Sequence, residues 1–383
     1  MIDYTDSSRK DSQLLWKKLY GLDAVYSRKT LLGLVRSSLA LLIISIAFFA
    51  LSLTPGNSLS VSSASGILPL LIAATALVLS LGWFSGNAAK VVYVRRLLKG
   101  RRYLADDPAR STYIDKAAVN EELDKVDDVR MIAEGPGWRL YDAVFDVMRH
   151  GRHGRYKAAE VYYTVLEADL KKQVPHMLFD SVSAKKKQFK NIYSRAQKLS
   201  PGPAFETAFD TYVPKYYQID ALSVITPEVM EAMLAVRDYD IELLDNRLLC
   251  YAPLLPAKEL ENFRLRCLGL QRHLDDNLRA YRDDRVRPGR RGEVSGFGRQ
   301  LLKNPFRNLP AAIAAALILA ALGLISILSA NPDIIFSRFS LLAAAVLVAT
   351  IADMVILKRK NSRREAIFLT AQTEMAKMRR PKD

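Results

Sequence analysis

The chain has 383 residues, half of them hydrophobic, and a net charge of +16 from 56 Lys and Arg against 40 Asp and Glu. Its mean hydropathy of +0.01 hides a split, because four stretches are almost free of charge while the rest is highly charged, which argues against a purely soluble protein. Each stretch is close to the ~20 residues with which a helix crosses a hydrocarbon core of about 30 Å. The sequence therefore predicts four transmembrane helices, in 37–53, 66–84, 309–330 and 339–357.

The charged flanks of these stretches indicate how the chain is oriented. The loop TPGNSLSVSSAS between the first two has no charge, whereas KVVYVRRLLKGRRY after the second and KRKNSRR after the fourth are densely basic. Because Lys and Arg collect on the cytoplasmic side, we expect two hairpins, over 31–86 and 309–357, in the inner (cytoplasmic) membrane of a bacterium. A cytoplasmic arm over 1–30 and a cytoplasmic basic tail over 358–383 then place both termini inside.

A cleaved signal peptide is the rival interpretation of the first stretch. The arm before that stretch is longer than the short positive region that a signal peptide carries. It also contains acidic residues at Asp3, Asp6, Asp11 and Asp23. We therefore expect the first stretch to remain as a membrane span.

The positive charge of the chain points first to a lipid partner. Much of it lies beside the ends of the predicted spans, where anionic lipid headgroups attract basic residues by ~1 kcal/mol each. Nucleic acid is therefore the weaker expectation. A further patch for anionic lipid or phosphate is predicted in AKKKQFKNIYSRAQK, at Lys185, Lys186, Lys187 and Lys190. The alternative for this patch is a solvated surface that binds nothing.

Between the two hairpins the sequence predicts a cytosolic α+β domain over 135–282. A juxtamembrane helical segment over 87–134 is expected to precede it, and a flexible basic linker over 283–308 is expected to follow. Two runs rich in β-formers, WRLYDAVFDVMRH and KAAEVYYTVLEADL, flank a Gly-containing turn and predict a β-hairpin. Pro175 in the next apolar run favours an edge strand or a strand start.

The second half of this domain begins with a well-marked helix. Thr226 is a good N-cap, Pro227 suits the first helical position, and the apolar face ends near Asp238. The runs IELL and RLLCY then predict two strands joined by a turn at Asp245 and Asn246. A long amphipathic helix over 256–281 follows, with a stripe at steps of three or four: Leu260, Phe263, Cys267, Leu270, Leu274, Leu278 and Tyr281. This stripe should pack on the sheet, with a coiled-coil contact to another subunit as the alternative.

Several of these motifs together resemble a family of bacterial membrane-associated proteins whose shared domain has no known function. The resemblance lies in an F-E-x-x-F start, a strand leading into a T-P-x-x-M helix, a D-N-x-L pair and an upstream F-D strand end. In this chain these are Phe205, Glu206, Phe209, Ile225, Thr226, Pro227, Met230, Asp245, Asn246, Leu248, Phe179 and Asp180. The segment KAAEVYYTVLEADLKKQVPHMLFDS is similar to uncharacterised membrane proteins of Saccharibacteria-type organisms. The match covers about 141–263, and it implies no activity, cofactor or catalytic residue.

A search for chemistry in the sequence finds no catalytic motif, so we expect no enzyme and no cofactor. No phosphate-binding glycine loop, dinucleotide fingerprint, zinc-protease helix or nucleophile elbow is present. His150 and His153 lie three apart among arginines, which favours a turn over a metal site. Cys250 and Cys267 lack C-x-x-C spacing and fall in the predicted cytosolic domain, so we expect free buried thiols.

Two charged residues in the predicted spans are candidate intramembrane polar or packing residues. Arg36 lies at the cytoplasmic edge of the first span, from which it can reach the headgroups. Asp353 shares a helical face with Ala345 and Ala349, and small residues on such a face allow close helix packing. We expect Asp353 to have a packing or interfacial role. An ion pathway is the alternative, because an ionisable intramembrane residue is a functional candidate.

These observations favour a membrane-anchored scaffold or binding module, whose cytosolic domain binds a protein, a lipid or an envelope assembly. A homo-oligomer is compatible with this reading. The alternative is a transporter or an enzyme acting on a membrane or lipid-linked substrate. Unbroken apolar spans and the lack of a catalytic motif argue for the first class.

Overall fold

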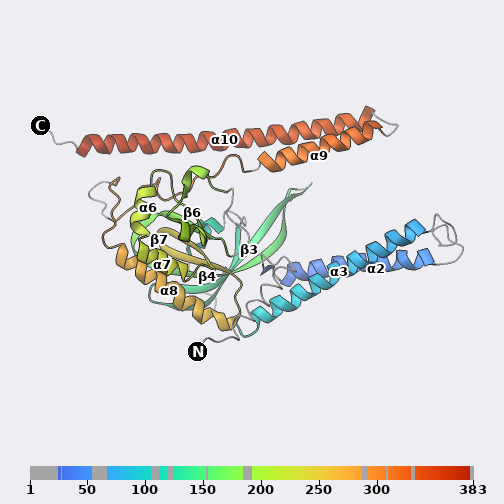
Figure 1. The fold of residues 1–383 in the computed structure, drawn as a ribbon, viewed down its shortest axis with the longest axis horizontal. Helices are drawn as coiled ribbons and strands as arrows, with labels where there is room; N and C mark the ends of the chain where they lie inside the picture. The colour runs from blue at the N-terminus through green and yellow to red at the C-terminus, as the bar shows by residue number, and fades with distance from the viewer. Residues whose placement is uncertain are drawn as a thin grey trace. The chain divides into compact units, whose positions relative to one another are not determined.

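The computed structural model describes residues 25–26, 28–53, 67–104, 112–119, 125–151, 154–183, 192–286, 292–307, 309–328 and 333–379. The chain forms two compact units. The N-terminal unit comprises Met1–Glu167 with Cys250–Cys267, and the C-terminal unit comprises Ala168–Leu249 with Leu268–Asp383. Each unit combines apolar helices with strands (Figure 1), so the predicted α+β class is confirmed in outline.

The N-terminal unit begins with the predicted helical hairpin. Helices α2 (Arg28–Leu53) and α3 (Ile67–Leu98) pack along one another, and both contain a stretch long and apolar enough to cross a membrane, Leu31–Leu51 and Leu71–Leu98. Fully or nearly buried residues of α3 recur at Ala73, Ser80, Asn87 and Val94. This spacing of seven is the repeat by which two helices keep one seam in contact.

The base of this hairpin is built into the core of the unit. Leu31 of α2 and Val94 and Leu97 of α3 form one buried cluster with Val144, Tyr162 and Leu254. The short strand β1 (Val25–Tyr26), just before α2, pairs with Tyr162 and Val161. The helices therefore join the domain through packed side chains and backbone hydrogen bonds.

Six further strands form the central antiparallel sheet. They are β2 (Lys125–Gly135), β3 (Trp138–Gly151), β4 (Gly154–Ser181), β5 (Lys198–Leu199), β6 (Phe209–Tyr212) and β7 (Asp240–Pro253). Among the described residues, their pairing order is β2-β3-β4-β6-β5, and β1 and β7 also pair with β4. The predicted hairpin is confirmed as the neighbouring strands β3 and β4.

The juxtamembrane segment over 87–134 was expected to be helical throughout, and this is wrong for its second half. Helix α3 ends at Leu98, a short 3-10 turn η2 covers Tyr113–Lys116, and β2 starts at Lys125. Strand β2 pairs with β3 from Lys125↔Asp146 to Gly135↔Trp138. This pairing gives Met131 a buried position, and such tertiary packing overrides a weak local helix preference.

The predicted turn at Asp245 and Asn246 is also wrong. Asp245 does adopt a positive φ of 54°, as a turn residue would, yet β7 continues through it to Pro253. Residues on both sides of it are buried, so a continuous strand hides apolar surface that a hairpin turn would expose. Pro175 likewise lies within the 28-residue strand β4 and not at a strand start.

The C-terminal unit also contains three short helices, α5 (Pro203–Glu206), α6 (Gln218–Val224) and α7 (Pro227–Leu234). Thr226 is the N-cap of α7 as predicted, although its hydroxyl bonds to Asn277 Oδ1 at 3.1 Å and not to the helix backbone. The long amphipathic helix is confirmed as a 3-10 turn η4 (Ala257–Glu259) followed by α8 (Leu260–Asn277). All seven residues of its predicted stripe are buried.

The C-terminal hairpin consists of α9 (Leu309–Leu328) and α10 (Asp333–Arg379), which pack side by side. Helix α10 has 47 residues, so the fourth apolar stretch and most of the predicted tail form one helix. At a rise of 1.5 Å per residue, α10 is about 70 Å long. Figure 1 shows α10 extending well past the start of α9.

A buried ion pair fastens the chain just after α3 in the N-terminal unit. Arg101 NH1 donates to Asp142 Oδ2, and Arg101 NH2 donates to the carbonyl of Leu255. Tyr103 and Thr164 also donate to Asp142, at 2.9 and 3.0 Å. The side chains of Arg101 and Asp142 are 1% and 0% exposed. Burial raises the pKa of Asp142 above its ordinary value, against the opposing effect of Arg101 and the hydroxyl donors.

We predict that the variant Arg101→Met destabilises the full-length protein in detergent by about 3–5 kcal/mol, because it leaves Asp142 buried without a cation. The double variant Arg101→Met/Asp142→Leu should unfold at a higher temperature than the single variant. Arg130→Met is the control, since its ion pair with Asp128 is exposed and should contribute about 1 kcal/mol or less. If the loss of unfolding free energy in the double variant equals the sum of the losses in Arg101→Met and Asp142→Leu alone, the two residues are not a coupled buried pair.

Candidate functional site

The segment that leads to the second hairpin was predicted to be a flexible linker over 283–308, and this is wrong for the part that the structure describes. Residues 283–286 and 292–307, here called the strap, belong to the C-terminal unit and pack against the rest of it. Val294, Leu301 and Leu302 of the strap are 2–6% exposed. Polar partners far away in the sequence hold the strap, which explains why its local composition gave no sign of order.

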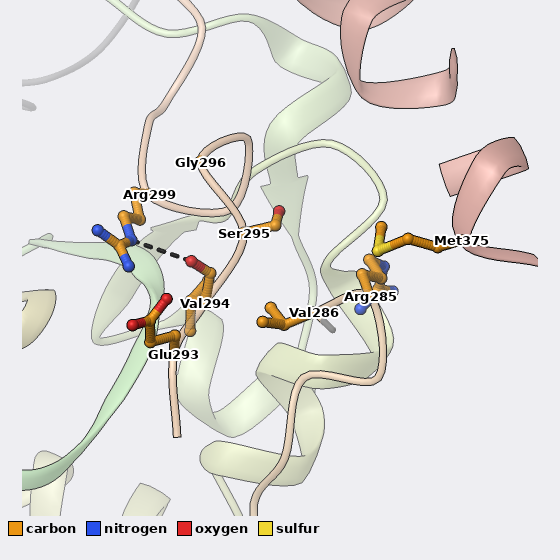
Figure 2. A pocket seen from close by; sticks show the side chains of 8 residues that line it. All are labelled: Arg285, Val286, Glu293, Val294, Ser295, Gly296, Arg299 and Met375. Carbon is orange, nitrogen blue, oxygen red and sulfur yellow. Dashed lines mark hydrogen bonds between the residues drawn. The ribbon is translucent and has the colours of Figure 1, made fainter. Parts of the chain in front are cut away.

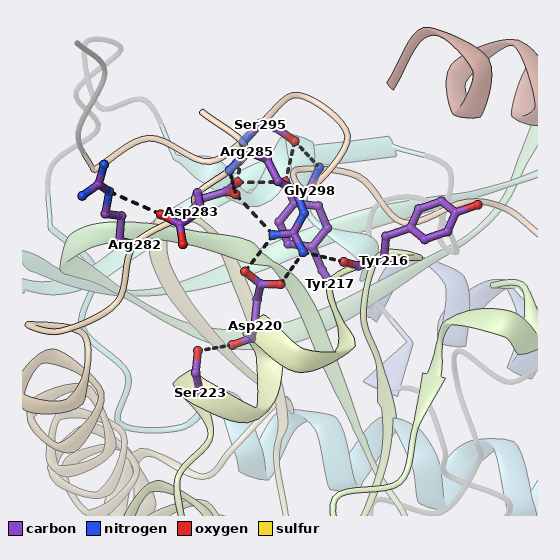
Figure 3. A network of polar contacts seen from close by, with 10 residues as sticks. Tyr216, Tyr217, Asp220, Ser223, Arg282, Asp283, Arg285, Ser295 and Gly298 are labelled. Atoms are coloured by element: carbon purple, nitrogen blue, oxygen red, sulfur yellow. Dashed lines mark hydrogen bonds and ion pairs between the residues drawn. The ribbon is translucent and has the colours of Figure 1, made fainter. Parts of the chain in front are cut away.

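Arg285 is the centre of the first group of strap contacts (Figure 3). Its guanidinium donates to both oxygens of Asp220 at 2.8 Å, to Asp283 Oδ1 at 3.3 Å and to the carbonyl of Tyr216 at 2.9 Å. The same group lies over the ring of Tyr217, 4.3 Å from its centroid. A planar fork that binds a carboxylate with two parallel bonds is a strong and directional contact. This contact joins the strap to α6.

Tyr217 forms the second half of this network and is completely buried. Its hydroxyl donates to Asp283 Oδ2 at 2.8 Å, and the backbone N–H of Ser295 donates to the same oxygen at 3.1 Å. Burial raises the pKa of Tyr217 above its ordinary value, and the charge of Asp283 raises it further, against a lowering by Ser295. The hydroxyl therefore keeps its proton and remains a donor at neutral pH.

Two glutamines and several backbone hydrogen bonds hold the rest of the strap. Gln173 Oε1 accepts from the N–H of Val294 at 3.1 Å and from Arg299 NH2 at 2.8 Å. Gln197 donates to the carbonyl of Leu302 at 2.8 Å and accepts from its N–H at 2.7 Å. The N–H of His176 donates to the carbonyl of Gly298 at 2.8 Å. These contacts fix the strap along its described length.

Helix α10 docks on the strap through an aromatic cluster. Phe368 is 6% exposed, and its ring stacks on Phe297 of the strap at 4.5 Å and on Tyr216 at 5.9 Å. Glu365 pairs with Lys215 at 3.1 Å, and Asn361 Nδ2 donates to the carbonyl of Lys303 at 3.0 Å. The three α10 residues follow steps of four and three, so one face of the helix makes all of these contacts.

Tyr216 adopts an uncommon backbone conformation at this cluster, with φ at 73°. A bulky residue at positive φ is disfavoured, and such residues persist only where their surroundings hold them. Here Arg285 bonds to the carbonyl of Tyr216, Phe368 stacks on its ring and Lys215 Nζ lies 4.9 Å from its ring centroid. The docked helix thus supports a conformation that the loop alone would not favour.

A pocket of about 450 Å³ opens between the strap and α10 (Figure 2). Strap residues 285–286, 293–296 and 299 line it together with Met375 of α10. The two arginines in its wall are engaged by the protein: Arg285 by Asp220 and Asp283, and Arg299 by Gln173 and the carbonyl of Val294. The wall also holds the carboxylate of Glu293. Its charge is therefore balanced, which disfavours a strongly anionic ligand.

Two further polar features lie elsewhere in the described residues. His176 Nε2 and Glu242 Oε1 form a buried pair at 2.6 Å in the C-terminal unit. In the N-terminal unit, ligand atoms of Asp127, Asp146 and Glu160 lie within 4.8 Å of one another, but Asp127 is exposed. Such surface acidic groups often occur without an ion. Neither of these features has the arrangement of a catalytic centre.

The predicted thiols are confirmed as free and buried. Burial raises the pKa of Cys267 well above its ordinary value, and a hydrogen bond with Cys250 raises it further. A buried thiol that keeps its proton is a poor nucleophile. These cysteines therefore belong to the packed core of the N-terminal unit.

The structure places the predicted site residues as follows. Arg36 is exposed on α2, and Asp353 is exposed on α10 together with Ala345 and Ala349, so that face points away from the rest of the chain. Lys185, Lys186, Lys187 and Lys190 lie outside the described residues, as does the side chain of His150. The residues of the strap network are not among the predicted site residues, and the only local signal for them is Phe297 between two glycines in SGFG.

Comparisons with known proteins assign no family to this chain. No family model matches it, and no curated protein matches its sequence. Among solved structures, it matches the crystal structure of the mycobacterial trehalose monomycolate transport factor A, TtfA, with a TM-score of 0.27 and 13% identity. This match covers 48% of the present chain and 93% of that one. At this TM-score the similarity supports no conclusion about function.

We predict that Gly298→Ala loosens the strap. A Cβ at this position would lie 2.6 Å from Tyr217 Cζ and 2.7 Å from Val294 Cγ1, and such overpacking costs about 1–3 kcal/mol. The variant should unfold at a lower temperature, and trypsin should cut the full-length protein faster after Arg299. Gly296→Ala is the matched control, because a Cβ there meets nothing within 4 Å. Equal effects of the two changes would contradict the tight contact.

Proposed function

We propose that this chain is a multi-pass protein of a bacterial cytoplasmic membrane, whose cytosolic α+β domain serves as a scaffold or binding module. In this proposal α9 and α10 cross the membrane as a second hairpin, in addition to α2 and α3, and both termini are cytoplasmic. The resemblance of residues 141–263 to bacterial membrane-associated proteins supports the bacterial assignment. The basic flanks of each hairpin support the orientation.

One observation carries the proposal: the domain joins its helices by packed, hydrogen-bonded contacts and not by flexible linkers. In the C-terminal unit, α10 runs without a break from its apolar run to Phe368, where it docks on the strap. In the N-terminal unit, α2 and α3 contribute to the same buried cluster as Val144 and Tyr162. A domain held in this way has a fixed orientation to the bilayer, which suits a platform that presents one surface to a partner.

The same contacts argue against an enzyme. In the described part of the chain, the two arginines at the strap pocket are held by protein groups, so neither is free to bind a substrate. The alternative, a transporter or an enzyme for a lipid-linked substrate, would use polar groups facing an interior path. Asp353 lies instead on an exposed face of α10. We therefore expect Asp353→Asn to leave the function of the protein largely intact.

The proposed topology with four membrane spans can be tested by introducing one surface cysteine at a time and labelling intact cells with a membrane-impermeant maleimide. We predict that Asn57→Cys and Asn331→Cys are labelled, because both loops face the periplasm in the proposed topology. Arg272→Cys on α8 is the cytosolic control and should react only after permeabilisation. The background should be low because Cys250 and Cys267 are buried. If Asn331→Cys reacts only in permeabilised cells, α9 and α10 do not cross the membrane.

The binding function can be tested by crosslinking the full-length protein in its native membranes, purifying it and analysing the eluate by mass spectrometry. We expect one protein to be recovered at near-stoichiometric amount, and Asp353→Asn to recover the same partner. A four-span membrane protein with the same tag is the control for non-specific capture. An eluate that contains no partner protein but is enriched in one lipid or small molecule would favour the transport or enzyme alternative.

A further inference from the structure

Two basic segments of the C-terminal unit meet where the strap runs into α9. The hydrogen bond from Asn361 Nδ2 to the carbonyl of Lys303 places this turn of α10 beside the end of the strap. On α10, Lys358 and Arg364 lie three residues before and after Asn361, so they flank it on the same helical face. Arg307 lies one turn beyond Lys303, where its N–H bonds to the carbonyl of Asn304. Cations from two separate segments are therefore gathered in one region.

The acidic residue next to these cations in the sequence, Glu365, is bound to a different lysine. The segments 299–307 and 354–364 contain no Asp or Glu. Within the described residues, Arg307, Lys358 and Arg364 make no ion pair, and Glu365 is paired with Lys215. Arg307 and Lys358 are exposed, and Arg364 is half-buried. This differs from the strap pocket, whose two arginines are already engaged by protein groups.

The position of this group along the chain places it at a membrane surface, if the topology of the proposed function holds. Arg307 is two residues before α9, and Lys358 directly follows the apolar run over 339–357. Phe306 is 49% exposed beside Arg307, and Ile313 and Leu317 of α9 are 46% and 66% exposed. An apolar surface thus continues from the cations along α9 in the direction that an acyl chain would take.

We infer that Arg307, Lys358 and Arg364 form a binding site for an anionic phospholipid of the inner leaflet. Arginine binds a phosphate through two parallel donors, and lysine adds a point charge. Basic clusters between helices on the cytoplasmic side are suited to such headgroups. The apolar surface of Phe306, Ile313 and Leu317 distinguishes a lipid from a free phosphate, which would not use it.

The test titrates the full-length protein in zwitterionic detergent with short-chain phosphatidylglycerol or phosphatidylcholine and measures the thermal midpoint at each lipid concentration. A ligand that binds only the folded state raises this midpoint. We expect stabilisation by phosphatidylglycerol alone. The variant Arg307→Gln/Lys358→Gln/Arg364→Gln should bind about a hundredfold more weakly.

The matched control is Arg272→Gln/Arg279→Gln/Lys377→Gln, which removes the same charge from exposed positions on α8, just after α8 and on α10. Its affinity should stay within about twofold of the unmodified protein, as for most surface changes. Equal losses in the two triple variants would overturn the site in favour of diffuse attraction. Stabilisation by inorganic phosphate as strong as that by the lipid would overturn the lipid assignment. The single variant Arg307→Gln, expected to lose about fivefold, serves if the triple variant does not fold.

This inference rests on the proposed topology, and the cysteine labelling separates the two failures. If Asn331→Cys is labelled in intact cells and the lipid titration shows no selectivity, the site is wrong and the topology stands. If Asn331→Cys is protected, α9 and α10 do not cross and both proposals fail.

Discussion

The C-terminal unit depends on the ion cluster of Arg285 with Asp220 and Asp283. The side chain of Asp283 is 0% exposed and that of Asp220 is 12% exposed, so both carboxylates are largely removed from water and Arg285 supplies the compensating positive charge. Removing charges from water is costly, and a buried pair adds little net stability. Its main effect is geometric, because the bonds from Arg285 to Asp220 fix the register of the strap against α6.

That register positions the aromatic cluster. Arg285 bonds to the carbonyl of Tyr216, and Tyr217 bonds to Asp283, so the two tyrosines are fixed beside the strap. Phe297 and Tyr216 then present their rings to Phe368 of α10. Because α10 is one helix of 47 residues, a contact at Phe368 fixes the direction of its whole length relative to the strap. The polar cluster thus determines how a predicted span leaves the domain.

The sequence predicted those features that depend on local composition. A membrane span must be apolar over its own length, so its sequence alone reveals it. The apolar residues from Leu260 to Tyr281 recur every three or four positions, and this spacing directly predicts which face of the helix is buried. Features that depend on distant partners could not be predicted. Arg285 binds Asp220, 65 residues earlier, and Arg299 binds Gln173, 126 residues earlier. Apart from Phe297 in SGFG, nothing in RDDRVRPGRRGEVSGFG indicates an ordered segment, and nothing in it identifies these partners.

The errors within the domain have the same physical origin. Asp245 has the backbone conformation of a turn residue, and only the burial of the residues on both sides of it shows that the strand continues. The segment of β2 has a mixed-charge sequence that suits a helix, and its pairing with β3 decides otherwise. In both cases the local sequence favours one structure, and long-range packing selects the other.

Helix α10 is docked on the strap of the C-terminal unit through Phe368. Spin labels at Thr373→Cys on α10 and Arg272→Cys on α8, with Cys250 and Cys267 replaced by alanine, would measure this by pulsed electron resonance on the full-length protein in lipid nanodiscs. One narrow distance distribution is predicted, which should broaden in Phe368→Ala and stay narrow in the control Ile367→Ala, whose side chain is 71% exposed. A broad distribution without any substitution at Phe368, or equal broadening in the two variants, would contradict the docked helix.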